Sequence, residues 1–177
     1  MLRAKELATA WRGKFYRSCE PKYAQSNDLV TGQGSFEHGG RWNGPGTCRA
    51  VYGSFTPEVA LQESLAALRR AGMDVAAGMP RVTTWVEASV VRLDLTDAKV
   101  LKVLGIASDE LTKEHWRAPG EGAEESLTEA LGRAAYAAGL EALEVPSAAV
   151  TGERNLVVFP ANLPADRPLQ GRGIEKA

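Results

Sequence analysis

The chain has 177 residues, 44% of them apolar, which is enough for one well-filled domain and too little for two. Its 21 basic and 22 acidic side chains give a net charge of −1. Because nucleic acids and anionic membranes attract clustered positive charge, we expect neither as a direct partner.

Apolar and β-branched periodicity predicts helices and strands in no strict alternation. In chain order the predicted segments are a short helix at 3–12, a strand at 14–19, an irregular loop at 20–48, a strand at 50–55, a helix at 57–71, a long strand at 81–95, a short helix at 97–104, the start of another at 108–110, a loop at 117–122, a helix at 124–138, a strand at 140–145, a loop at 146–154 and a strand at 155–159. Strands that come early, in the middle and late predict an α+β domain, a mixed β-sheet with flanking helices. We assign residues 1–165 to this single domain and expect 166–177 to form a flexible C-terminal tail.

The helix at 57–71 has the clearest start signal in the chain. Thr56 is a capping residue, Pro57 suits the first helical position, and Glu58 suits the positive end of the helix dipole. Three leucines at helical spacing form its expected core stripe, namely Leu61, Leu65 and Leu68. Glu63 lies nearly opposite that stripe, on a face of small residues against which another group can pack.

Cellular location and metal content are predicted from what the sequence lacks. No apolar run is long enough to span a bilayer, and the first seven residues have no apolar core like that of a secretion signal. Cys19 and Cys48 are not in a Cys-x-x-Cys spacing, so we expect idle thiols in a reducing compartment. With only His38 and His115, an ordinary zinc site is not expected. These features predict a cytoplasmic protein without a metal.

The stretch from Gly39 to Glu63 carries the strongest functional signal. A glycine-rich loop, Gly-Gly-Arg-Trp-Asn-Gly-Pro-Gly at 39–46, precedes the strand at 50–55. Arg41 lies in this loop, and Arg41, Tyr52 and Glu63 are equally spaced along the chain. Loops as long as 20–48 are usually functional or disordered in a compact domain. The aromatic residues among its glycines favour an ordered loop that faces a ligand.

This pattern resembles the RES-domain family. The resemblance covers roughly residues 14–160, and its motifs are Arg17 after an aromatic pair, Gly-Gly-Arg-Trp-Asn-x-x-Gly at 39–46, Val-Tyr at 51–52, Pro-Glu-x-Ala-x-x-Glu at 57–63 and Val-Pro-Ser at 145–147. Members are bacterial toxins of Xre–RES toxin–antitoxin systems. The resemblance implies an ADP-ribosyltransferase-like fold, NAD as a substrate rather than a true cofactor, and a helix-turn-helix antitoxin as the partner that covers the 20–48 loop. The family's site falls on Arg17, Arg41, Tyr52, Glu63 and Ser147.

The same residues suit the chemistry of NAD. The planar forks of Arg17 and Arg41 can each pair with two diphosphate oxygens. An ionised Glu63 can bind a ribose hydroxyl and stabilise the cation that develops when the nicotinamide–ribose bond breaks. Tyr52 can stack on the nicotinamide or donate a hydrogen bond, and Ser147 and Asn155 can bind the nicotinamide amide or a phosphate. We assign Arg41, Tyr52 and Glu63 to catalysis, and Arg17, Arg41, Tyr52, Ser147 and Asn155 to NAD binding.

Three functions remain open at this point. The first is a toxin that depletes NAD by hydrolysis or phosphorolysis. The second is a mono-ADP-ribosyltransferase that modifies a host protein; such enzymes often carry a second acidic residue just before the catalytic glutamate, where this chain has Leu61 and Gln62. The third is a non-catalytic nucleotide-binding or interaction domain. The Leu/Ala-rich helices also allow a homo-oligomer.

Overall fold

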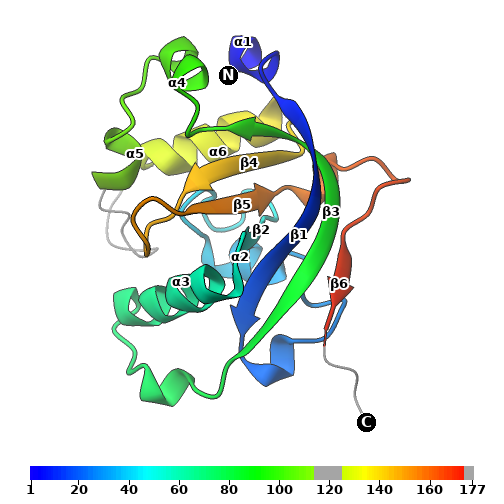
Figure 1. Ribbon diagram of the computed structural model, residues 1–177, viewed down its shortest axis with the longest axis vertical. Helices are drawn as coiled ribbons and strands as arrows, with labels where there is room; N and C mark the ends of the chain where they lie inside the picture. Colours follow the sequence, from blue (N-terminus) through cyan, green and yellow to red (C-terminus); the bar gives the residue numbers. More distant parts are fainter. Residues whose placement is uncertain (114–124, 174–177) are drawn as a thin grey trace.

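The computed structural model describes residues 1–113 and 125–173 (Figure 1). Its helices and strands are α1 (Leu2–Lys5), β1 (Thr9–Cys19), α2 (Gln33–His38), β2 (Val51–Ser54), α3 (Pro57–Arg70), β3 (Val82–Asp94), α4 (Ala98–Leu104), α5 (Glu110–Lys113), α6 (Leu127–Ala137), β4 (Ala142–Pro146), β5 (Arg154–Val158) and β6 (Gln170–Arg172), with short 3-10 turns at Pro21–Tyr23, Ala76–Gly78 and Pro160–Asn162. The predicted loop at 117–122 and the first residue of the helix predicted at 124–138 lie outside the described residues. No helix within the described ranges is both long and apolar enough to cross a bilayer.

The strands form one six-stranded mixed sheet in the order β1-β2-β5-β4-β3-β6. β3 runs parallel to β4, and the other pairs are antiparallel. β1 also pairs with β3 along its whole length, so the pairings of β1, β2, β5, β4 and β3 form a closed circuit. The prediction of an α+β fold with a mixed sheet is confirmed.

Two apolar clusters fill the fold on either side of the strands β4 and β5. Leu143 and Val157 belong to the cluster that packs under α4 and α6, whereas Ala142 and Val158 belong to the cluster enclosed by β1, β2 and β3. Successive side chains of a strand point to opposite faces, which is why neighbouring residues enter different clusters. Burial on both faces explains the continuous apolar run Leu156-Val157-Val158 of β5, whereas in β4 the run is interrupted by Glu144, which is buried and paired with Arg92 and Arg154.

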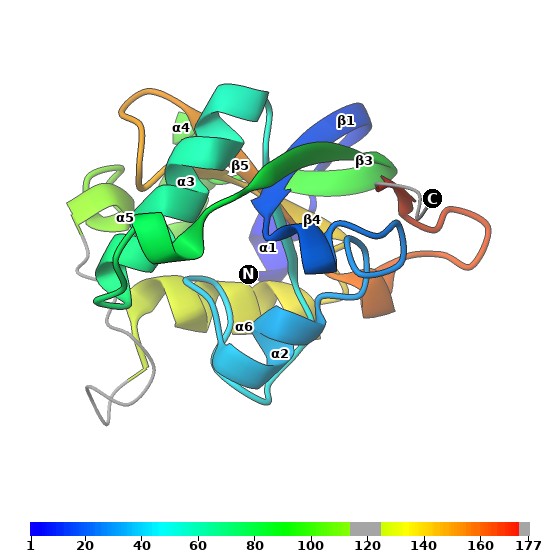
Figure 2. The same ribbon diagram turned by 90° about the horizontal axis from the view of Figure 1, so that it is seen from below.

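The helices cover the sheet from two sides (Figure 2). α3 lies on one side and packs against β1, while α6 and α2 lie on the other. α6 begins with a capping box, in which Ser126 and Glu129 each bond the backbone N–H of the other. At its other end, Lys5 Nζ donates to the Ala138 carbonyl oxygen at 2.6 Å, a favourable place for a cation near a helix C-terminus.

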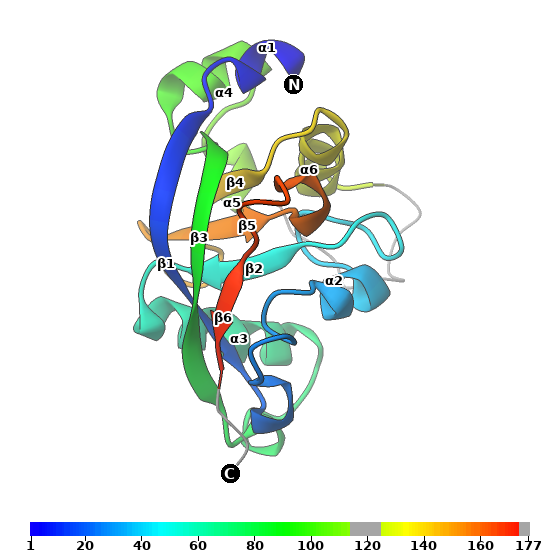
Figure 3. The same cartoon turned by 90° about the vertical axis from the view of Figure 1, so that its right-hand side faces the viewer.

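The N-terminal segment differs from its prediction. The helix expected at 3–12 is confined to α1, and the strand expected at 14–19 begins at Thr9. β1 pairs residue by residue with β3 from Thr9↔Arg92 to Cys19↔Val82. A local helical pattern is weaker than this ladder of long-range hydrogen bonds, so the segment is extended (Figure 3).

Two further segments are more ordered than predicted. The loop expected at 20–48 contains the helix α2. The tail expected from residue 166 contains β6, which pairs with β3 through Trp85↔Arg172 and Glu87↔Gln170, so the prediction of a flexible tail is wrong for these residues. Prolines at 164 and 168 suppress local periodicity, and a three-residue strand that depends on its partner has no periodicity of its own.

The predicted leucine stripe of α3 is wrong as a core stripe. The buried residues of α3 are Val59 and Ala60, while Leu61, Leu65 and Leu68 are only partly buried and belong to neither apolar cluster. The face that includes Ala60, Glu63 and Ala67 is turned towards a cavity instead. One face of α3 therefore borders a cavity, while the helix also packs against the strands.

Candidate active site

A cavity of about 410 Å³ lies where α2, α3 and the strands β1, β2 and β5 meet. Five of the six predicted site residues line it, namely Arg17, Arg41, Tyr52, Glu63 and Asn155. The sixth, Ser147, sits between two lining residues, Pro146 and Ala148, and hydrogen-bonds Glu63. The structure thus brings together side chains that span most of the chain.

Arg17 is a partly buried cation at one side of the cavity. One guanidinium nitrogen, Nη1, donates to the Leu29 carbonyl oxygen, and no ion pair joins Arg17 to a carboxylate among the described residues. Burial lowers the pKa of Arg17 from its ordinary value, while the neighbouring Cys19 acts in the opposite direction. A buried guanidinium without a carboxylate partner is suited to an anionic ligand.

Arg41 extends from the glycine-rich loop and contacts α5. Its Nη2 donates to the Leu111 carbonyl oxygen, and Leu111 is fully buried. Arg41 thereby joins the loop to a helix that lies far along the chain. Arg41 is still one of the residues that line the cavity.

Tyr52 is held by two hydrogen bonds within the protein. Its hydroxyl donates to Asn43 Oδ1 at 2.6 Å and accepts from the Trp42 backbone N–H at 3.0 Å. Burial raises the pKa of Tyr52 above its ordinary value. Asn43 is fully buried, and its Nδ2 donates to the carbonyl oxygens of Ser35 and Cys48. The Tyr52 proton is therefore used to hold the loop, and its ring remains the part that can face a ligand.

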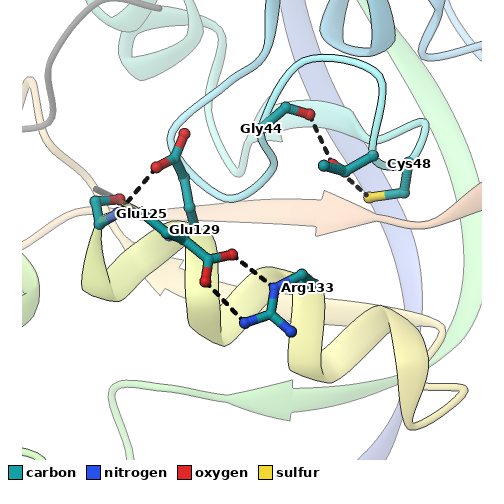
Figure 4. Close-up of polar contacts among 7 residues, drawn as sticks. Gly44, Cys48, Glu125, Glu129 and Arg133 are labelled. Carbon is teal, nitrogen blue, oxygen red and sulfur yellow. Dashed lines mark hydrogen bonds and ion pairs between the residues drawn. The ribbon is translucent and has the colours of Figure 1, made fainter. Parts of the chain in front are cut away.

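The glycine-rich loop is fixed between Tyr52 and α6. A Cβ at Gly40 would lie 2.6 Å from the Tyr52 hydroxyl, so only glycine leaves room for that group. On the other side, a Cβ at Gly132 of α6 would lie 1.8 Å from the Trp42 carbonyl oxygen. Figure 4 shows the first turns of α6, with Glu129 and Arg133, beside the loop residues Gly44 and Cys48. The loop backbone thus rests directly on α6.

The Glu63 side chain extends from α3 towards four hydrogen-bond donors of the β4–β5 hairpin. Its Oε1 accepts from Ser147 Oγ at 2.6 Å, from Asn155 Nδ2 at 2.6 Å, and from the backbone N–H groups of Ala148 and Ala149 at 2.9 and 3.3 Å. Consecutive backbone N–H groups of this kind form a concave site for an anion. Ser147 and Asn155, predicted to bind NAD, contact Glu63 in the structure.

Sequence reasoning missed several cavity residues, of which Ser54 matters most. Ser54 is buried, and its Oγ donates to Asn155 Oδ1 at 2.6 Å. The alternation of strand side chains places Ser54 on the same face as Tyr52, two residues earlier, so that periodicity was the available signal. Asp28, Gln33, Ser64 and Arg70 also line the cavity and carried no motif. Among residues 1–113 and 125–173, no group of three or more His, Cys, Asp or Glu side chains is placed to hold a metal ion.

The fold is α+β, and its cavity is lined by Arg17, Arg41, Tyr52 and a Glu63 that four hydrogen bonds hold in place. The chain belongs to the RES-domain family, whose model, described as "RES domain", matches residues 14–172. The resemblance predicted from the motifs is confirmed.

The fold also resembles a solved structure. The chain is similar to a chain in the crystal structure of the M. tuberculosis MbcT–MbcA toxin–antitoxin complex, with 21% sequence identity and a TM-score of 0.73. The match covers 97% of this chain and 88% of that one. No curated protein sequence matches the chain.

Proposed function

We propose that the protein is the toxin of a toxin–antitoxin system and that it cleaves the nicotinamide–ribose bond of NAD. Membership of the RES-domain family and the similarity to a chain of the MbcT–MbcA complex support the toxin assignment. The observation that carries the enzymatic assignment is made in one cavity: the Arg17 guanidinium has no carboxylate partner among the described residues, and the Glu63 carboxylate is held by four donors.

The two charged groups suit the two ends of NAD. The diphosphate gives Arg17 an anionic partner, which it does not have within residues 1–113 and 125–173, and a charge-assisted hydrogen bond to it contributes about 1.5–3 kcal/mol. Arg41 lines the same cavity and offers a second guanidinium. Fixing the diphosphate orients the rest of the dinucleotide, which lowers the entropic cost of reaching the transition state.

Glu63 supplies the negative charge that the reaction requires. Breaking the glycosidic bond leaves an oxocarbenium-like ribose and a neutral nicotinamide, so the leaving group needs no general acid. A fixed carboxylate stabilises the ribose cation without reorganising, because the hairpin donors already hold it in place. Water or phosphate then attacks the ribose, which gives ADP-ribose or its phosphorylated form.

Nicotinamide release from NAD tests this proposal. The purified protein should release nicotinamide, and the rate with and without phosphate separates phosphorolysis from hydrolysis. Glu63→Gln should lower kcat by a factor of about 100 or more, the usual loss when a group that stabilises transition-state charge is removed. Glu58→Gln, an exposed change on the same helix, is the matched control and should leave kcat unchanged. A wild-type protein that releases no nicotinamide under either condition would refute the NAD-cleaving role.

The acceptor and the toxicity need separate assays. Label from NAD that appears on a protein would identify a mono-ADP-ribosyltransferase, whereas label only in small molecules supports NAD depletion. Gln62, the residue before Glu63, is exposed and lies outside the cavity lining, so no acidic side chain stands there to activate a protein acceptor. Expression of the chain alone in bacteria should arrest growth and lower cellular NAD, and co-expression of a helix-turn-helix antitoxin should restore both. Normal growth at good expression contradicts the toxin assignment.

A further inference from the structure

Glu63 is held by a chain of hydrogen bonds that begins on a neighbouring strand. Ser54 of β2 and Asn155 of β5 are register partners, and Ser54 Oγ donates to Asn155 Oδ1 at 2.6 Å. With its oxygen bound in this way, the Asn155 amide turns its nitrogen towards Glu63 and donates to Oε1 at 2.6 Å. Both ends of the Asn155 amide therefore have a suitable partner: the oxygen accepts from Ser54, and the nitrogen donates to Glu63.

Ser147 also directs a donor towards Glu63, and its own hydrogen bonds fix that direction. Its Oγ accepts from the backbone N–H groups of Ala149 and Val150, at 3.2 and 3.0 Å. Because a serine hydroxyl has two acceptor positions and one proton, both acceptor positions are occupied and the proton goes to Glu63 Oε1 at 2.6 Å. Ser147 is 7% exposed and is not one of the residues that line the cavity.

The two carboxylate oxygens of Glu63 differ as a result. Oε1 accepts all four hydrogen bonds from Ser147, Ala148, Ala149 and Asn155. Among the described residues, Oε2 has no hydrogen-bond partner, although Glu63 lines the cavity. One oxygen is thus a fixed anchor, and the other is the oxygen that a substrate can meet.

We propose that Ser54, Asn155 and Ser147 are positioning residues that hold Glu63 by Oε1 and present Oε2 to the substrate, with Ser54 acting through Asn155. This inference rests on the proposed function, since it gives these residues a role in the reaction of Glu63. It also replaces the sequence-based expectation that Ser147 and Asn155 bind NAD directly. Positioning residues change the rate of the chemical step more than the binding of the substrate.

The test is a comparison of kcat and KM for nicotinamide release. Ser54→Ala should lower kcat about tenfold and leave KM within about threefold, because a small misplacement of a catalytic group costs rate. Ser54→Thr keeps the hydroxyl and should restore most of kcat. Ser89→Ala, a partly buried serine on β3 away from the cavity, is the matched control and should change neither constant.

A second variant keeps the test decisive if Ser54→Ala fails to fold. Asn155→Asp is nearly isosteric and still accepts from Ser54, but it places a carboxylate against Glu63, so kcat should fall about a hundredfold. Rising KM with unchanged kcat in these variants would mean that Asn155 contacts the substrate, and this result overturns the proposal. Unchanged kcat in Ser54→Ala would also overturn it.

A structural readout separates this proposal from the proposed function. If the wild-type protein releases no nicotinamide, the NAD-cleaving role fails while the positioning claim is still open to a crystal structure. In Ser54→Ala crystals, the Asn155 side chain should leave Glu63 or occupy more than one rotamer. An Asn155–Glu63 contact that stays at its wild-type distance would show that Ser54 positions nothing.

Discussion

In the proposed function, binding of the NAD diphosphate depends on Arg17. Arg17 lines the cavity, and its guanidinium is bonded to the Leu29 carbonyl oxygen and has no carboxylate partner among the described residues. An anion that enters the cavity therefore meets a cation that is already desolvated and oriented. Such pre-organisation lowers the cost of binding.

Arg17→Lys is expected to raise the Kd for NAD about 10- to 100-fold. The lysine keeps the charge but loses the planar fork that pairs with two phosphate oxygens, a loss of roughly 1.5–3 kcal/mol. Titration calorimetry on a variant with Glu63→Gln in the background measures this without turnover. Arg12→Lys, an exposed change on the same strand, is the control and should bind as the parent does. Equal affinities for both would contradict the role of Arg17.

Tyr52 has a structural role that the sequence did not indicate. Tyr52→Phe removes the bonds to Asn43 Oδ1 and the Trp42 N–H, and both partners are buried. We expect the free energy of unfolding to fall by about 1–3 kcal/mol, the cost of leaving buried polar groups unsatisfied. Urea denaturation measures it, and Tyr23→Phe at an exposed site should change little. If Tyr52→Phe is as stable as the wild type, the loop does not depend on this hydroxyl.

The same tyrosine predicts a loss of stability in alkaline solution. Burial raises the pKa of Tyr52 above its ordinary value of 10.0, so above that pH the unfolded chain releases a proton that the folded chain retains. The contribution of the protonated Tyr52 to the free energy of unfolding is fully present below pH 10.0. As the pH rises beyond 10.0, the free energy of unfolding falls. Unfolding measured at several pH values should show a shallower decline for Tyr52→Phe. Identical slopes for the two proteins would contradict the buried, protonated tyrosine.

At the scale of elements, sequence patterns that span a few residues predicted the structure correctly. Features that depend on pairing or packing with a distant segment were not predicted. Thr56 caps α3 by accepting from the Val59 N–H, as the sequence indicated. The leucines of α3 were wrongly predicted to form a core stripe, because helical spacing shows that a face is apolar without showing what it packs against. The strand predicted at 14–19 lies within β1, but the start of β1 at Thr9 and the whole of β6 were missed because both are defined by pairing with β3. Local patterns carry no information on that pairing.

The contact between α6 and the glycine-rich loop is the element-scale feature most open to test. Gly132→Ala would place a methyl group 1.8 Å from the Trp42 carbonyl oxygen, where neither backbone can yield easily. Overpacking of this kind typically costs about 1–3 kcal/mol, and the loop should also shift, so both the melting temperature and nicotinamide release should fall. Gly34→Ala in α2 meets no atom within 4 Å and is the control for stability. A Gly132→Ala protein as stable as wild type would mean that α6 does not fix the loop.

For the molecule as a whole, the sequence predicted which residues form the site better than what each one contacts. Arg17, Arg41, Tyr52 and Glu63 stand in recognisable motifs, and they line one cavity. The contacts between Glu63 and Asn155, or between Ser54 and Asn155, join residues 92 and 101 positions apart. They follow from the register of β2 against β5 and from the shape of the β4–β5 hairpin, which no motif encodes.

The proposed function requires one cavity to hold NAD between Arg17 and Glu63. A crystal structure of the Glu63→Gln variant with NAD tests it most directly, because that variant should bind the dinucleotide without consuming it. The diphosphate should lie on Arg17, and the nicotinamide ribose should lie within hydrogen-bond distance of the residue 63 side chain. NAD bound elsewhere on the protein, or bound here with its diphosphate away from Arg17, would contradict it.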